Sequence, residues 1–119
     1  MRGHKKLDVY KESMRLVKAI YEATASFPNS ELYGLTNQIR RCAVSVPSNI
    51  AEGAARSGDR EFLKFLYIAR GSLSELETQL AIAKELGFLT RDDALSLQIE
   101  KIFGLLGGLI NSLKRRIEE

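Results

Sequence analysis

Residues 62–83 read FLKFLYIARGSLSELETQLAIA and carry the clearest structural signal in the chain. Apolar residues recur there at alternating spacings of four and three, and Gly71 does not interrupt the series. Since positions three and four apart share one side of a helix, this seven-residue repeat predicts a long amphipathic helix. Ser57 or Asp59 is expected to cap its start, and Gly87 to end it. The stripe comprises Phe62, Leu66, Ala69, Leu73, Leu76, Leu80 and Ala83.

The same spacing predicts three more helices on either side of this stretch. The first covers residues 7–27, before Pro28, and the second runs from Leu35 to the glycine-containing break at residues 53–58. The fourth is expected to begin at the cap Thr90. The first helix carries two adjacent stripes, which are Tyr10, Met14, Val17, Tyr21 and Leu16, Ile20, Ala23, Phe27. The stripes of the second and fourth are Leu35, Ile39, Ala43, Val46, Ile50 and Leu95, Ile99, Ile102, Leu106, Leu109, Leu113.

Pro47 falls inside the second helical pattern. Proline lacks an amide hydrogen and its ring crowds the carbonyl four residues back, at a cost of about 3 kcal/mol in a helix interior. Two short helices are one solution. We favour a single bent helix, because the apolar register from Ile39 to Ile50 continues through the proline.

The chain contains no alternating strand pattern between these helices, so we predict an all-α, antiparallel up-down four-helix bundle. Its 119 residues, 45% hydrophobic and 28% charged, suit one domain, which we assign to residues 7–119. Arg2, Lys5 and Lys6 account for the whole net charge of +3. Residues 1–6 are therefore expected to form a mobile basic arm.

The residue composition argues against catalysis, cofactors and metal binding. One cysteine cannot form an intramolecular disulfide, and His4 alone cannot supply a multi-histidine metal site. Cys42 lacks a histidine base and is expected to be a small buried side chain. Residues 53–58 lack the Lys-Ser/Thr of a phosphate-binding loop. We therefore expect a non-enzymatic protein without cofactor or metal.

No stretch of the sequence is expected to enter a membrane. The most apolar segment, residues 102–113, is about half the roughly 20 residues that a membrane-spanning helix needs. The N-terminus meets acid at Asp8 before any apolar run that would suit a signal peptide. We expect a cytoplasmic protein.

Three glycines weaken the predicted fourth helix. Gly104, Gly107 and Gly108 each cost up to about 1 kcal/mol relative to alanine, so a close helix contact is expected to offset that cost. The contact lies either within the chain or between subunits of an oligomer. Oligomerisation is also favoured by apolar residues that exceed one bundle's core. These residues are Phe65, Ile68 and Ile82, with Leu16 and Ile20 widening the first helix.

Basic residues indicate a candidate nucleic-acid surface. Arg40 and Arg41 stand in a stretch, residues 32–51, that contains no acid, and Lys64 and Arg70 lie near successive turns of the third helix. Together they are candidates for phosphate contacts. The alternative is that they are ordinary surface charges paired with acids such as Glu52, Glu75 or Glu77.

Several motifs resemble the four-helix-bundle family of 23S ribosomal RNA intervening-sequence proteins. Residues 33–41 read YGLTNQIRR and residues 45–53 read SVPSNIAEG, and the second of these motifs is the more specific. Further similar segments are LDVY at residues 7–10, FLKFL at 62–66, ARGS at 69–72 and ELETQL at 75–80. At Tyr10 the family often has tryptophan.

The resemblance implies an up-down bundle that assembles as a ring of five subunits. It also implies similarity to an accessory protein of diversity-generating retroelements, which binds nucleic acid and a reverse transcriptase. It supplies no catalytic residues, and it implies that Arg40, Arg41 and Arg70 are candidates for contacts. We therefore expect a non-enzymatic homo-oligomer, a pentamer by resemblance, that binds structured RNA or another nucleic acid. The alternative is a protein-interaction scaffold without nucleic-acid binding.

Overall fold

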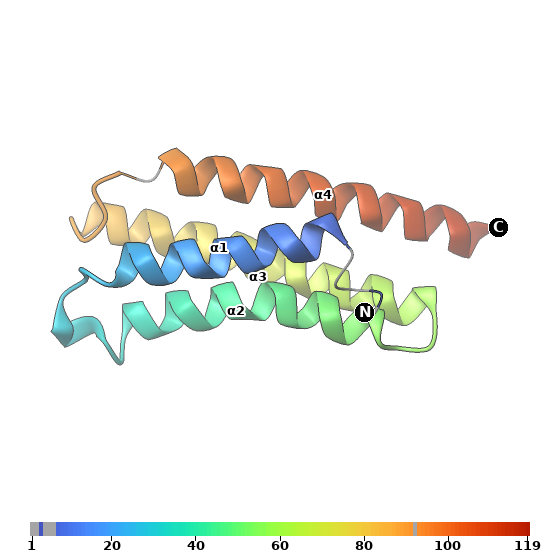
Figure 1. Ribbon diagram of the computed structural model, residues 1–119, viewed down its shortest axis with the longest axis horizontal. Helices are drawn as coiled ribbons and strands as arrows, with labels where there is room; N and C mark the ends of the chain where they lie inside the picture. The colour runs from blue at the N-terminus through green and yellow to red at the C-terminus, as the bar shows by residue number, and fades with distance from the viewer. Residues whose placement is uncertain (1–2, 4–6, 92) are drawn as a thin grey trace.

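The computed structural model describes residues 3, 7–91 and 93–119, and the regular elements in this part of the chain are all helices, with no strand. The elements are α1 (Asp8–Thr24), the short 3-10 turn η2 (Asn29–Glu31), α2 (Leu35–Ala54), α3 (Asp59–Glu85) and α4 (Asp93–Glu118). The four α-helices lie along one long axis (Figure 1). The predicted all-α fold and four-helix bundle are confirmed.

Contacts between helix ends give the direction of each helix. Arg40, near the start of α2, donates from Nε to Oγ1 of Thr24, the last residue of α1, over 2.9 Å. Arg116, near the end of α4, donates to both carboxylate oxygens of Asp59, the first residue of α3, over 3.0 and 2.9 Å. Adjacent helices in the chain therefore run in opposite directions, as Figure 1 shows.

The core follows the α3 stripe closely. Of the predicted residues, Phe62 is half-buried and the other six are buried. In α4 the stripe is buried as predicted except at Leu109, which is half-buried, while Ile110 is buried in its place. The periodic pattern therefore predicted these two faces almost completely.

The predicted core of α1 needs a correction. Leu16, Ile20 and Phe27 are buried, whereas Met14 and Tyr21 are 48% and 44% exposed. Leu16 and Ile20 are therefore core residues and not surplus apolar surface. The buried face also includes hydroxyl side chains, which the apolar pattern does not register.

Both buried hydroxyls of α1 are satisfied within their own helix. The hydroxyl of Ser13 donates to the carbonyl of Val9 over 2.6 Å, and that of Thr24 donates to the carbonyl of Ile20 over 2.8 Å. A hydroxyl bonded in this way can be buried without the cost of an unsatisfied polar group. The core face of α1 is thereby rotated away from Met14 and Tyr21.

Pro47 is buried within a continuous α2. The single-helix alternative is therefore confirmed over two short helices. Two residues later, Asn49 donates from Nδ2 to the carbonyl of Ser45 over 2.8 Å and also bonds the Ser45 hydroxyl over 3.0 Å. The carbonyl that loses its backbone donor to the proline is that of Ala43, four residues back, so the Asn49 bond adds a contact at Ser45 and does not replace the missing one.

The ends of α3 differ in how well they were predicted. Gly58 is the N-cap residue and makes no side-chain cap bond, so neither Ser57 nor Asp59 caps the helix as predicted. The Asp59 carboxylate is engaged by Arg116 instead. At the other end Gly87 has φ 79°, and Phe88 donates its amide to the carbonyl of Ala83 over 2.9 Å, which confirms the glycine stop.

Two further predictions concerned the start of α4 and the N-terminal arm. Helix α4 begins at Asp93, so Thr90 does not adjoin its first turn and is not the cap. The predicted basic arm, residues 1–6, lies outside the described residues apart from Gly3. Among the helices of the described chain, none combines the length and the apolar character that a bilayer crossing requires.

Gly53 of α2 approaches α3 too closely to leave room for a β-carbon, a contact that the residue spacing did not predict. A β-carbon at Gly53 would lie 2.6 Å from Cβ of Phe65 and 3.0 Å from Cδ1 of Phe62. Real β-carbons essentially never approach so closely, so an alanine there would force the helices apart. Gly53 therefore sets the spacing between α2 and α3.

Replacing Gly53 by alanine should destabilise the protein by about 1–3 kcal/mol, because the added methyl group overpacks the contact between α2 and α3. The matched control is Gly71→Ala in α3, where an added β-carbon meets nothing within 4 Å. That control should stabilise by up to about 1 kcal/mol through helix propensity. Urea unfolding measures both; equal effects of the two substitutions would contradict the close contact.

Candidate functional site

Arg40 holds α2 against α1. In addition to its bond with Thr24, its guanidinium lies 4.6 Å from the centroid of the Tyr21 ring. The side chain is half-buried, and the stacked arrangement suits a planar cation on an aromatic face. Arg40 therefore has a structural contact in addition to its charge.

Arg41 and Lys64 are exposed on α2 and α3, respectively. Arg70 is also exposed and stacks on Tyr67 of its own helix, with the guanidinium 4.9 Å from the ring centroid. Two of the four predicted cations thus have aromatic partners, and the other two, Arg41 and Lys64, are exposed without one.

The four cations make no ion pair within the described part of the chain. Glu52, which was one expected partner, pairs with Arg56 over 2.9 Å. Glu75, another, accepts a bond from Cys42. The alternative in which the four cations are neutralised by Glu52, Glu75 or Glu77 is therefore not seen among the described residues. Their charges remain available to an anionic partner.

A single chain does not gather these cations into one patch. Gly53 of α2 faces Phe62 of α3, so Lys64 lies level with the end of α2. Arg40 lies 13 residues before Gly53, which separates it from Lys64 by roughly 20 Å along the bundle. The register of α2 against α3 therefore spreads the predicted phosphate contacts along the bundle.

The cations also lie on different flanks. Arg40 contacts Tyr21 of α1 and so faces the α1–α2 side. Arg70 is seven residues after Leu63, which borders a pocket shared with α4, and so lies on the α3–α4 side. A continuous basic surface that includes all four residues is therefore absent from one subunit.

Cys42 is buried as predicted. Its thiol donates to the carbonyl of Ser72 over 3.0 Å and to the carboxylate of Glu75 over 3.3 Å. Burial first, and the Glu75 carboxylate second, raise the pKa of the thiol from its ordinary 9.0 to about 12. The group is therefore protonated at neutral pH and is a poor nucleophile.

Apart from Cys42, the described residues show little that suits metal binding. They contain no group of three histidine, cysteine, aspartate or glutamate side chains that could hold a metal ion. On α1, the bond from Lys101 of α4 holds the pKa of Glu12 below its ordinary value. The lowered pKa reflects an ion pair between the two side chains. Nζ of Lys101 lies 3.2 Å from Oε1 of Glu12, and the pair joins α1 to α4.

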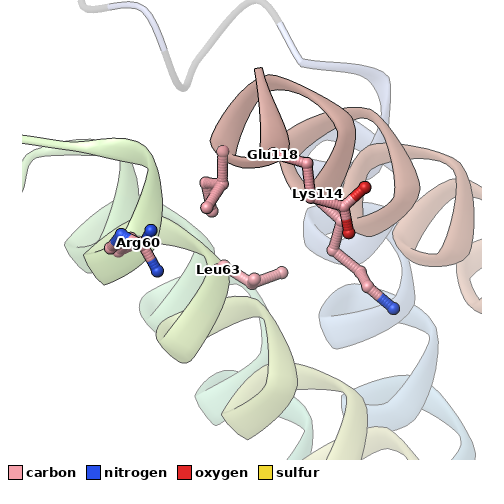
Figure 2. Close-up of a pocket in the computed structure, with 5 residues that line it drawn as sticks. Arg60, Leu63, Lys114 and Glu118 are labelled. Atoms are coloured by element: carbon pink, nitrogen blue, oxygen red, sulfur yellow. The ribbon is translucent and has the colours of Figure 1, made fainter.

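One opening lies between the start of α3 and the end of α4 and measures about 470 Å³. Figure 2 shows Arg60 and Lys114 on opposite sides of Leu63, with the Lys114 ammonium directed away from Arg60. Glu118 adds a negative charge to the same rim. The two cations do not converge, so this opening is not organised as an anion site.

A second opening is an apolar groove between α1 and α2, of about 340 Å³. We call it the α1–α2 groove. Met14 is 48% exposed there and Val44 is 39% exposed, and Tyr21 extends the apolar surface along α1. The residues that line the groove are Tyr10, Met14, Val17, Val44, Pro47, Ser48 and Ala51.

The glycines of α4 do not form the contact proposed within the chain. A β-carbon at Gly104, Gly107 or Gly108 would meet no heavy atom of the described chain within 4 Å. Gly104 and Gly108 are exposed, because the opposite side of α4 carries the core residues. The intrachain alternative is therefore wrong, and the oligomer alternative stays a prediction.

The sequence profile of the 23S rRNA-intervening sequence protein family matches residues 5–108. The chain belongs to this family. The matched range contains all four candidate cations, the α1–α2 groove and the three glycines of α4. A search among curated proteins found no match. Any more specific function of this 23S rRNA-intervening sequence family protein is therefore inferred from the geometry of the described residues.

At pH 8, iodoacetamide should alkylate Cys42 on the order of 1000-fold more slowly in the folded chain than in urea, because a pKa of about 12 in place of 9.0 lowers the thiolate fraction by that factor. Mass spectrometry of timed samples measures the two rates. Glu75→Gln should speed the folded-state reaction, since that carboxylate helps raise the pKa.

The same shift affects stability in alkali. The folded-state pKa of Cys42 lies above the unfolded value, so its contribution is complete below about pH 9 and is lost as the pH rises toward 12. Cys42→Ala should remove that part of the alkaline loss. Equal alkylation rates in the folded and unfolded chain would show that the thiol is not protected.

Proposed function

We propose that this protein is a non-enzymatic, cytoplasmic homo-oligomer that binds structured RNA or another nucleic acid through exposed cations. The observation that supports the proposal is the absence of ion pairs at Arg40, Arg41, Lys64 and Arg70 within the described chain. A cation without a protein partner can take the place of a counterion condensed on the phosphates of a nucleic acid. Binding to phosphates then releases counterions and gains free energy from that release.

The non-enzymatic part of the proposal is supported by the state of the one cysteine. Cys42 is buried, bonded to Ser72 and Glu75, and held protonated. Nucleophilic catalysis requires an accessible thiolate with an adjacent base. The other described side chains that could interact with a partner lie on the surface. There they can bind, but they do not form an organised catalytic centre.

The oligomeric part is supported by exposed apolar side chains. Ile68 and Ile82 of α3 are 43% and 45% exposed, and Met14 and Val44 face solvent at the α1–α2 groove. Apolar side chains grouped on a surface favour association with another surface. A pentamer, which the family resemblance implies, would also place cations from several subunits around one assembly.

Assembly would compensate for the spread of cations in one chain. Arg41 and Lys64 are the best candidates for phosphate contacts, because both are exposed and neither stacks on an aromatic ring. Repetition of such weak contacts around an oligomer increases avidity without a new contact in any subunit. Arg40 and Arg70 would contribute charge while remaining held by Tyr21 and Tyr67.

Fluorescence titration of a labelled RNA hairpin against the purified protein over a range of salt concentrations tests the proposal. The double variant Arg41→Gln, Lys64→Gln should weaken binding and reduce the slope of log affinity against log salt by about 0.7–0.9 for each lost phosphate contact. The matched control is Arg15→Gln, which removes a cation already paired with Glu12. Its slope should stay unchanged.

If the wild-type protein binds the hairpin with no salt dependence, or not at all, nucleic-acid binding is wrong. The α1–α2 groove would then favour the alternative, a protein-interaction scaffold, because its apolar lining suits a polypeptide better than a phosphate backbone. Retention of a partner from nuclease-treated lysate would support that alternative.

A further inference from the structure

We propose that the assembly forms through two different faces: the outer stripe of α3 in one subunit seats in the α1–α2 groove of the next. We define the outer α3 stripe as Ile68, Glu75 and Ile82. The proposal rests on the proposed homo-oligomer and specifies which surfaces meet. Its occupant is a second copy of this chain.

The groove is the receiving surface. Its floor and walls are almost entirely apolar, with Val17, Pro47 and Ala51 at its base and the exposed Met14 at its edge. From Tyr10 to Tyr21 the apolar surface of α1 extends for roughly 16 Å at 1.5 Å per residue. The groove itself spans Tyr10 to Val17 on α1, roughly 10 Å, and Tyr21 continues the apolar surface beyond it, so a ridge that covers both would exclude water along the whole face.

The outer α3 stripe provides such a ridge. Its residues recur every seven positions and therefore form one line on the helix, roughly 21 Å from Ile68 to Ile82. The two isoleucines are 43% and 45% exposed, whereas the core stripe of α3 is buried except at the half-buried Phe62. Within the described part of the bundle Glu75 bonds Cys42 of α2, while the two isoleucines keep nearly half of their surface exposed.

The charges beside the two faces are complementary. Lys18 lies between Met14 and Tyr21 on α1, and Lys11 lies one turn before Met14; neither makes an ion pair among the described residues. On α3 the acid Glu75 lies between the two isoleucines, and its contact in the described chain is with the Cys42 thiol. Lysines beside the groove would meet a carboxylate on the stripe, whereas stripe against stripe would oppose like charges.

The two faces can be used at the same time by one subunit. The groove lies between α1 and α2, while Glu75 lies on the α2-facing flank of α3, as its contact with Cys42 shows. Each subunit could thus offer its stripe to one neighbour and its groove to another. Such a head-to-tail interface builds a closed ring if its rotation closes, and a filament if it does not.

Mixing two complementary variants tests this arrangement. Ile82→Asp places a charge on the stripe and Met14→Asp places one in the groove, and both sites are exposed enough for each chain to fold, which circular dichroism checks. By native mass spectrometry each variant alone should be monomeric, with a dissociation constant raised at least about 100-fold. An equimolar mixture should form a heterodimer, because it retains one intact stripe and one intact groove.

The control is Leu97→Asp on the outer side of α4, where the leucine is 73% exposed and away from both faces. It should leave the wild-type assembly intact. If wild type is itself monomeric, homo-oligomerisation and this inference both fail. If wild type assembles but the two variants still self-associate, or dissociate without forming the heterodimer, only the proposed pairing is overturned. Dissociation by Leu97→Asp would place the interface on the glycine face of α4 instead.

Discussion

At Gly53 the backbone of α2 lies against Phe62 and Phe65 so closely that no β-carbon fits between the helices. This contact fixes the spacing and the register of α2 on α3, and the rest of the bundle depends on that register. It places Cys42 opposite Ser72 and brings the hydroxyls of Ser45 and Ser72 to 2.7 Å. Because the register is fixed, each outward side chain also has a defined flank and height on the molecule.

The interior and the surface of this family member carry different kinds of side chain. The interior is mostly apolar, and the hydroxyls of Ser13 and Thr24 and the thiol of Cys42 are bonded to nearby carbonyl oxygens, whereas the buried Thr36 hydroxyl has no hydrogen-bond partner among the described residues. The surface carries cations that make no ion pair among the described residues, and apolar side chains such as Ile68, Ile82 and Met14, which are 43%, 45% and 48% exposed. The proposed binding and assembly would use these surface side chains.

The distribution of cations shows why assembly matters to the proposed function. Arg40 and Lys64 are separated by roughly 20 Å along the bundle, and Arg70 lies on the α3–α4 side. One subunit therefore offers scattered contacts, each of modest strength in water. A ring joined by the outer α3 stripe and the α1–α2 groove would repeat those contacts at regular intervals, which suits an extended polyanion better than a small ligand.

Local periodicity determined the helices, the buried side of α3 and the glycine stop at Gly87, because each depends on residues within a few turns. Tertiary packing decided the rest. It made the stripe through Leu16 the core of α1, since bonded hydroxyls can be buried, and it turned Gly104 to solvent while Gly53 took the close contact. It also separated the cations. These outcomes depend on how each helix is rotated and shifted against its neighbours, which residue spacing within one helix does not specify.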